Sequence, residues 1–173
     1  MTVKDAIQIF QSSQKNIHRK RTKDSYRYIL EHLEDHFADI HVEVITPDHI
    51  YQFLESLTEH LAKSTRRLRY AQLKAFFNFL INEKRHSMKN PCQDSVMVKA
   101  FKSPRMKQKD IFSRESVDEM IYRSKKIRDR LILELQARCG MRIGEVLNLR
   151  ASDITDRKLI IRQPKSGKDI EVA

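Results

Sequence analysis

Glycine and proline are scarce in this chain, and that scarcity favours a mainly helical fold. The sequence has 173 residues but only 3 glycines and 4 prolines, so few positions suit the tight turns that join short strands. Two of the glycines, Gly140 and Gly144, lie in one stretch, Cys139–Ile154. Gly140 follows an apolar helical run, where a left-handed C-terminal cap is expected. We therefore expect one helix to end at Gly140 and another to begin directly after it.

Apolar residues at helical spacing predict a four-helix bundle in the first part of the chain. A short amphipathic helix is expected over residues 3–13, and Thr22 is the expected N-cap of a second helix. Thr46–Asp48 has the cap, proline and acid of a strong helix start. Ser64 opens the fourth helix, and Asn90–Pro91 ends the bundle. The fourth helix is expected to bury one apolar stripe made of Leu68, Ala75, Phe76, Phe79 and Leu80.

A basic segment without apolar periodicity divides the chain into two expected domains. Residues 102–111 are the linker, which separates a helical domain over residues 1–101 from a smaller α+β domain over residues 112–173. The linker carries Lys107 and Lys109, which lie near DNA phosphates if the two domains close around a duplex. The alternative is a solvated, mobile segment.

The second domain is expected to combine helices with one β-hairpin. Ser113 caps a first helix, and residues 127–139 form a second one that ends at Gly140. The apolar run Leu159–Ile161 predicts a strand over residues 158–162, followed by a turn over residues 163–167 and a returning strand over residues 168–172. We expect apolar surface on the second helix to be uncovered and this domain to be less protected than the bundle.

The charge distribution favours a polyanionic partner, and nucleic acid before a membrane surface. The formal net charge is +11, and Lys and Arg neutralise phosphates with release of counterions. From Tyr28 to Ala62 there is no Lys or Arg, so the bundle is expected to have one basic and one acidic side. The alternative is two solvated charged faces. The residues expected to contact double-stranded DNA are Lys15, Arg19, Lys20, Arg21, Lys23, Lys63, Arg66, Arg67, Tyr70, Lys74, Lys107 and Lys109.

Other classes of protein are disfavoured by what the sequence lacks. It has no apolar run long enough to span a bilayer and no signal-peptide pattern at its start. Cys92 and Cys139 have no paired spacing, which fits neither a disulfide framework nor zinc and indicates a reducing cytoplasm. His32 and His36 are one turn apart but have no convincing set of further ligands. We therefore expect no cofactor, no metal and no membrane partner.

Arg142 is the strongest candidate for chemistry. It follows Gly140 at the start of a helix, and its neighbours in the sequence are apolar, which predicts a guanidinium held on a buried scaffold. A positioned Arg offers five donors in a rigid fork that fits a phosphodiester. The alternative is a capping or salt-bridging Arg142 that orients Glu145.

The stretch around Arg142 resembles the first arginine box of the tyrosine recombinases, the phage-integrase family. Cys139 stands where the family usually has threonine. The first hundred residues resemble the family's helical core-binding domain less specifically, through Thr22–Tyr26, Ile50–Leu57, Ser64–Leu80 and Asn90–Pro91. The positions that match the arginine box are Gly140, Arg142, Glu145, Val146, Leu149, Asp153 and Ile154.

The resemblance implies a function and roles for individual residues. Family members cleave and rejoin DNA through a tyrosine that forms a 3′-phosphotyrosyl intermediate, while arginines stabilise the transition state. Arg142 would be the first of these arginines, with Glu145 in support. A lysine on the hairpin protonates the 5′ leaving oxygen. Lys165 is expected in that role, with Lys168 as its companion, and the alternative is two solvated turn lysines.

Other parts of the family's catalytic set have no counterpart here. None of the 5 tyrosines follows Arg142, and the last of the 7 histidines is His86. The chain ends at Ala173, so we expect an N-terminal portion with a truncated catalytic domain that binds DNA without cleaving it. The full-length enzyme is expected to be oligomeric on DNA, and this fragment monomeric without DNA. Alternatives are a non-catalytic module that occupies recombination sites and a helical protein-interaction domain.

Overall fold

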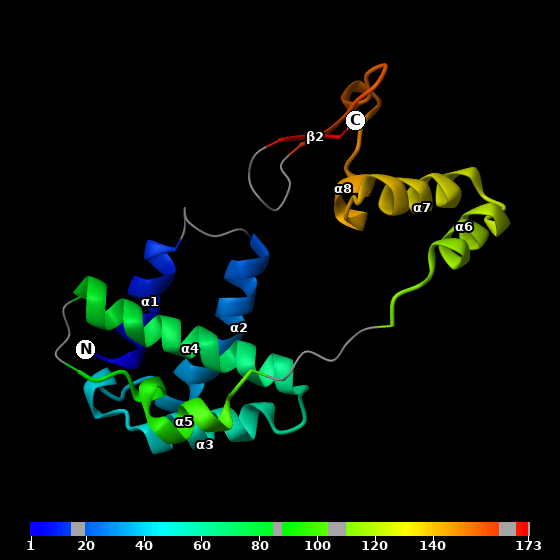
Figure 1. Cartoon of the computed structure of the whole chain (residues 1–173). Coiled ribbons are helices and arrows are strands. Elements are labelled where there is room, and N and C mark those ends of the chain that lie inside the picture. The colour runs from blue at the N-terminus through cyan, green and yellow to red at the C-terminus, as the bar shows by residue number, and fades with distance from the viewer. Residues whose placement is uncertain (15–19, 85–87, 104–109, 163–168, 173) are drawn as a thin grey trace. The chain divides into compact units, whose positions relative to one another are not determined.

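The computed structural model describes residues 1–14, 20–84, 88–103, 110–162 and 169–172. The chain forms two compact units, residues 1–106 and 107–173, and the boundary between them lies within the expected linker. Its described part is mostly helical, with one small antiparallel sheet (Figure 1). This confirms the predicted fold class of helices with a β-hairpin.

The first unit is built from helices, and capping side chains set the start of α1, α3 and α5. Its elements in order are α1 (Val3–Ser13), α2 (Lys20–Phe37), the 3₁₀ turn η1 (Val42–Val44), α3 (Pro47–Thr58), α4 (Lys63–Lys84), the 3₁₀ turn η2 (Pro91–Gln93) and α5 (Ser95–Ala100). Thr46 caps α3 as predicted, because its Oγ1 accepts a hydrogen bond from the His49 backbone N–H at 3.2 Å. Thr22 lies inside α2 and Ser64 inside α4, so neither is the cap that the sequence predicted.

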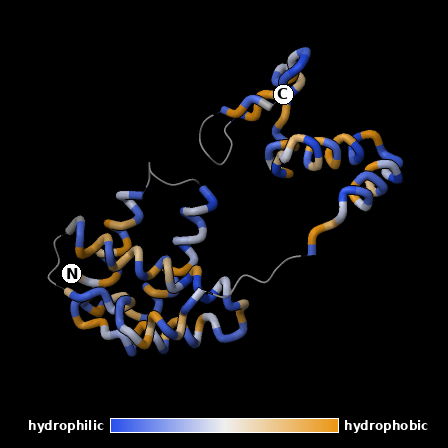
Figure 2. Tube along the Cα trace, in the orientation of Figure 1, coloured by the Kyte–Doolittle hydropathy of each residue, from blue (hydrophilic) through white to orange (hydrophobic). Residues whose placement is uncertain are grey.

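Helix α4 is the central element of this unit and packs against α1, α2 and α3. Hydrophobic positions recur along each helix (Figure 2), and those that face inward form one continuous core. Phe76 and Phe77 of α4 are fully buried, and the Phe76 ring meets the Phe10 ring of α1 edge-on at 5.5 Å. Leu30, Leu33, Ile50, Phe53 and Leu54 complete the centre of this core.

The predicted end of the bundle at Asn90–Pro91 is wrong, because the chain adds α5 and packs it onto the core. Asp94 caps α5 by accepting a hydrogen bond from the Val96 N–H at 2.8 Å. Met97 and Phe101 are then buried against the other helices. At six residues, α5 is too short to show a clear helical period in the sequence.

The second unit has a much smaller core. Its elements are α6 (Arg114–Arg123), α7 (Ile127–Cys139), α8 (Ile143–Leu147), the 3₁₀ turn η3 (Ala151–Asp153), β1 (Leu159–Ile161) and β2 (Ile170–Val172). The strands are antiparallel, with Ile160 opposite Glu171. Ser113 caps α6 as predicted, and Gly140 ends α7 with a φ of 63°. Its core cluster consists of Met141, Val146 and Ile161, and Ile121 of α6 is buried as well.

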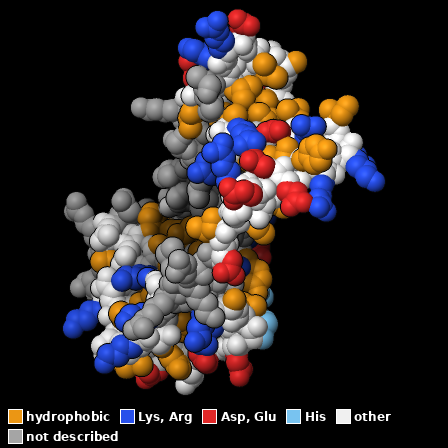
Figure 3. All heavy atoms as spheres, turned by 45° about the vertical axis from the view of Figure 1, so that its right-hand side comes forward, with side chains coloured by type: hydrophobic (Ala, Val, Ile, Leu, Met, Phe, Trp, Pro, Cys, Tyr) orange, Lys and Arg blue, Asp and Glu red, His pale blue; other side chains and the backbone are white. Residues whose placement is uncertain are grey.

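Apolar side chains remain exposed on the second unit (Figure 3). Ile127 is 88% exposed, and no residue of α7 is buried. This confirms the uncovered apolar surface expected on that helix. Large contiguous apolar patches mark interaction sites, whereas single exposed hydrophobic residues are normal on protein surfaces. Those on the second unit are Ile111, Phe112, Met120, Tyr122, Ile127, Leu131, Ile143, Leu147, Ile154 and Ile170.

Candidate nucleic-acid interface

The start of α2 presents exposed cations. Lys20 and Arg21 are exposed on the first turn and Lys23 is half-buried. Arg27, one turn further on, lies 3.6 Å from the carboxylate of Asp24. Of the other cations expected here to contact DNA, Lys15 and Arg19 lie outside the described residues, as do Lys107 and Lys109 of the linker.

The basic residues of α4 are arranged differently from the prediction. Leu68, expected in the core, is 48% exposed, while Tyr70, expected on the basic face, is only 2% exposed. The reason is the segment that follows α4: η2 packs against α4, the Tyr70 hydroxyl donates a hydrogen bond of 2.7 Å to the Cys92 carbonyl of η2, and the Tyr70 ring stacks on Phe101. Tyr70 is therefore a core residue and does not present its side chain to a ligand.

The two adjacent arginines of α4 are held by neighbours within the unit. Arg66 forms an ion pair with Glu55 of α3. Arg67 donates through Nε to the Ser103 hydroxyl at 3.3 Å, and its guanidinium carbon lies 5.0 Å from the Tyr70 ring centre. Lys63 is exposed at the first position of the helix, and Lys74 is half-buried. The structure thus places Lys63, Arg66 and Arg67 at one end of α4, with the two arginines in fixed positions.

Arg69 joins α2 to α4, a role that the sequence analysis missed. Its Nη1 donates to the Ser25 carbonyl of α2 at 2.9 Å and to Gln72 Oε1 at 3.0 Å. Its guanidinium carbon lies 4.3 Å from the ring centre of Tyr28. Burial lowers the pKa of Arg69, although an arginine stays charged at neutral pH. No local pattern marks this role, because Ser25 lies 44 positions away on another helix.

The turn after α7 positions Arg142 as the N-cap of α8. Glu145 holds it from two sides: one carboxylate oxygen accepts from the Arg142 backbone N–H at 2.8 Å, and the other accepts from Nη1 at 3.0 Å. These two hydrogen bonds, that from the backbone above all, lower the pKa of Glu145. The carboxylate therefore stays ionised and keeps the guanidinium aligned.

The expected buried scaffold under Arg142 is only partly present. Met141 and Val146 are buried, but Ile143 and Leu147 are exposed. The Arg142 side chain is 67% exposed, so it is oriented by Glu145 and not enclosed by apolar residues. The difference arises because α8 has only five residues and buries only one side.

The last residue of η3, Asp153, is a buried acid whose partner is Arg162, which directly follows β1. Asp153, 3% exposed, accepts a hydrogen bond from Arg162 Nε at 2.5 Å and another from the Arg150 backbone N–H at 3.0 Å. Both lower the pKa of Asp153, the one from Arg162 most. Lys165 and Lys168 lie outside the described residues.

The second unit is expected to lose stability in acid through Asp153. Its folded-state pKa lies below the unfolded value of about 3.9. Its contribution is therefore complete above that pH and is lost as the pH falls through the folded-state pKa. Backbone amide signals of β1, followed by NMR from neutral pH to about pH 2, should show this loss.

Asp153→Asn should remove most of that acid dependence. The control is Asp156→Asn, which changes an exposed carboxylate of the same unit. If Asp153→Asn kept the acid profile of the parent, the Asp153–Arg162 pair would not hold the hairpin.

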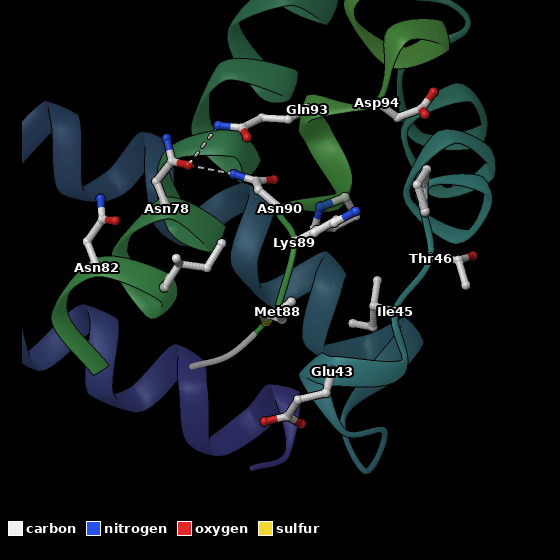
Figure 4. Close-up of a pocket in the computed structure, with 13 residues that line it drawn as sticks. Glu43, Ile45, Thr46, Asn78, Asn82, Met88, Lys89, Asn90, Gln93 and Asp94 are labelled. Atoms are coloured by element: carbon white, nitrogen blue, oxygen red, sulfur yellow. Dashed lines mark hydrogen bonds between the residues drawn. The ribbon is translucent and has the colours of Figure 1, made fainter. Parts of the chain in front are cut away.

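Two hollows of different chemical character are found in the first unit. The larger, of about 860 Å³, has a mixed lining of apolar side chains, amides, the carboxylates of Glu43 and Asp94, and Lys89 (Figure 4). Asn78 accepts hydrogen bonds there from Asn90 at 2.8 Å and from Gln93 at 3.4 Å. These amides therefore bond to one another and stabilise the wall of the hollow. The smaller hollow, of about 300 Å³, is lined by cations at the start of α4. The cations of the smaller one suit a phosphate.

Comparison with known proteins assigns both units to one family. The N-terminal SAM-like domain of phage integrases matches residues 12–84, and the phage integrase family domain matches residues 104–173. The chain belongs to the phage integrase family of tyrosine recombinases. No group of three or more potential metal ligands occurs among the described residues of this integrase-family chain. None of its described helices is long and apolar enough to cross a membrane.

Two curated relatives match in sequence. Tyrosine recombinase XerA of Pyrococcus furiosus is 36% identical over 100 residues, which cover 56% of this chain and 32% of XerA. Tyrosine recombinase XerC of Caldanaerobacter subterraneus subsp. tengcongensis is 26% identical over 136 residues, covering 69% of this chain and 34% of XerC. The match therefore spans about a third of each relative.

Solved integrases share the fold over nearly the whole chain. A lambda integrase dimer bound to a COC′ core site aligns with a TM-score of 0.71 and 20% identity, covering 99% of this chain and 48% of that one. The Tn1549 transposon integrase in complex with circular intermediate DNA aligns with a TM-score of 0.72 and 17% identity, covering 99% and 60%. At these identities the likeness concerns the fold.

Proposed function

We propose that this chain binds double-stranded DNA as part of a site-specific recombinase. The observation that carries the proposal is the placement of cations on α2 and α4, two helices that Arg69 joins through Ser25. Lys20 and Arg21 are exposed on one helix and Lys63 on the other. Exposed cations on two joined helices suit the phosphates of a duplex. Solved relatives support it, since the lambda and Tn1549 integrases are described in complexes with DNA.

The test is the salt dependence of duplex binding. A fluorescent duplex of unrelated sequence should bind, and the logarithm of its affinity should fall linearly with the logarithm of salt concentration. The slope should be about 0.9 for each phosphate neutralised. An affinity that is independent of salt, or no binding at about 50 mM salt, would favour the protein-interaction alternative.

For the second unit, we propose that Arg142 binds the phosphate at which the recombinase acts. Its exposed fork is aligned by Glu145 but remains open to a ligand. We further propose that Lys165, with Lys168 as its companion, acts together with Arg142 at this phosphate. Without DNA the chain is expected to be monomeric, and the proposal places it in the cytoplasm.

Arg142→Ala should weaken duplex binding by about two- to fivefold and reduce the salt slope by about one. It should change the free energy of unfolding by less than about 1 kcal/mol, because exposed ion pairs contribute little. Arg157→Ala is the matched control, an exposed arginine of the same unit. A large loss of stability with unchanged affinity would identify Arg142 as a structural residue instead.

A further inference from the structure

The first half of α2 carries cations but adds no fully buried side chain to the core. Helix α2 crosses α4, and its start projects beyond the crossing (Figure 1). Lys20 and Arg21 are exposed there. Tyr26 is partly buried, and its ring centre lies 5.4 Å from that of Phe10 of α1. The buried side chains of α2 all lie in its second half: Ile29, Leu30 and Leu33. The core therefore fixes the first half of α2 less firmly than the second.

Polar contacts tie this first half to α4. Arg69 donates through Nη1 to the Ser25 carbonyl at 2.9 Å and to Gln72 Oε1 at 3.0 Å. Gln72 in turn donates through Nε2 to the Ser25 hydroxyl at 2.8 Å. The guanidinium carbon of Arg69 lies over the Tyr28 ring, 4.3 Å from its centre. Ser25, Tyr28, Arg69 and Gln72 thus form one connected set, here called the α2–α4 bridge.

The bridge is a costly way to join two helices. Gln72 is only 5% exposed, and the Arg69 Nε is buried with no hydrogen-bond partner among the described residues. A buried polar group lowers stability unless it is hydrogen-bonded. Two well-packed apolar side chains would join the helices at less cost. A satisfied polar network, however, restricts two helices to one geometry more strictly than apolar contacts do. The composition of the bridge therefore favours a role in geometry.

We propose that Arg69 and Gln72 are positioning residues for duplex binding. They hold the first half of α2 at a fixed place on α4, so that cations of the two helices meet the phosphates without reordering on binding. Ser25 follows Lys20 by five residues and Arg69 follows Lys63 by six. At 1.5 Å per residue, the bridge stands roughly 7.5 and 9 Å along the helices from these cations. Neither positioning residue contacts the DNA itself. The inference rests on the proposed duplex binding and adds the element that aligns its cations.

Gln72→Leu is the sharpest test, because Gln72 is buried and the change leaves the net charge as it is. The variant should bind a fluorescent duplex about three- to tenfold more weakly, since the first half of α2 must then be ordered on binding. The logarithmic salt slope should stay within about 0.3 of the parent's, because no phosphate contact is lost. Fluorescence anisotropy over a range of salt concentrations measures both.

Arg69→Met should act in the same direction. It removes the hydrogen bonds to Ser25 and Gln72 and should weaken binding about three- to tenfold, again with little change in slope. Arg69→Lys keeps the charge but not the planar fork, so it should restore only part of the affinity. The double variant of Arg69 and Gln72 should lose less than the two single losses combined, since both residues belong to one network.

A local readout in the absence of DNA identifies the geometry as the cause. Hydrogen exchange followed by NMR should be faster at the amides of residues 24–28 in Gln72→Leu and Arg69→Met, while the amides of α3 keep their rates. If either variant does not fold, Ser25→Ala replaces it: this change removes only the hydroxyl that Gln72 contacts, and should weaken binding about two- to threefold.

Val42→Ala is the matched control for stability. Val42 is fully buried in η1, beyond the opposite end of α2. Its truncation should lower the thermal midpoint of the first unit but leave duplex affinity and exchange at residues 24–28 as in the parent. An equal loss of affinity in Val42→Ala would show that stability, and not the position of α2, governs binding, and would overturn the inference.

The remaining outcomes separate this inference from the proposed function. If the parent binds with steep salt dependence and Gln72→Leu and Arg69→Met bind equally well, the positioning role is wrong and the proposed function stands. If Arg69→Met lowers the slope by about one while Gln72→Leu binds like the parent, Arg69 contacts a phosphate itself and the positioning role is overturned. If the parent does not bind the duplex, both proposals fail.

Discussion

Replacing Lys20, Arg21 and Lys63 together by glutamate is expected to lower duplex affinity about 100-fold at about 0.15 M salt. These side chains are exposed on α2 and α4, and each is expected to neutralise one phosphate. The logarithmic salt slope should become shallower by about three. Fluorescence anisotropy over a range of salt concentrations measures both quantities.

The matched control reverses three other exposed lysines of the same unit, Lys4, Lys89 and Lys99. This control variant changes the net charge by the same amount. A comparable loss of affinity would show that overall charge, and not the position of Lys20, Arg21 and Lys63, governs duplex binding. Arg66 is left intact, because a glutamate there would face Glu55 without its partner. Tyr70→Phe is a second control: it removes a buried hydrogen bond but should leave affinity unchanged.

Phe76→Ala is expected to destabilise the first unit by about 3–5 kcal/mol. Phe76 is fully buried on α4 and its ring meets those of Phe10 and Phe77, so truncation leaves a cavity in the centre of the core. Hydrogen exchange followed by mass spectrometry should show faster exchange in α1 to α4. The amides of α6 to β2 should keep their rates, because they belong to a separate compact unit.

The control for that experiment is Phe112→Ala. Phe112 is 72% exposed in the second unit, so its removal should change stability by less than about 0.5 kcal/mol. Equal acceleration of exchange in both units by Phe76→Ala would mean that the units unfold as one cooperative block.

The fold was predictable wherever a local chemical signal sets the backbone. Thr46 followed by Pro47 starts α3, and Gly140 ends α7, because a cap and a left-handed residue act over a few positions. Helix α5 was not predictable in this way. Six residues give too little periodicity, and α5 is stabilised by Met97 and Phe101 packing on helices distant in sequence.

The candidate site was predictable in composition but not in detail. The sequence indicates that α4 is rich in cations, yet the burial of Tyr70 depends on its contacts with Cys92 of η2 and with Phe101, which come later in the chain. The bridge from Arg69 to Ser25 likewise depends on how two helices meet. For Arg142 the pairing with Glu145 follows from their three-residue spacing, while the exposure of the guanidinium depends on how little of α8 is covered.

The left-handed backbone at Gly140 limits which residues can replace this glycine. A Cβ built there would meet no atom within 4 Å, so the position is constrained by its φ of 63° and not by space. Asparagine, the L-residue that enters this region most readily, is therefore the tolerable replacement, whereas a β-branched residue of similar size is not. The turn before Arg142 therefore limits substitutions at Gly140 through the backbone torsion angle that it requires, and not through the volume of the side chain.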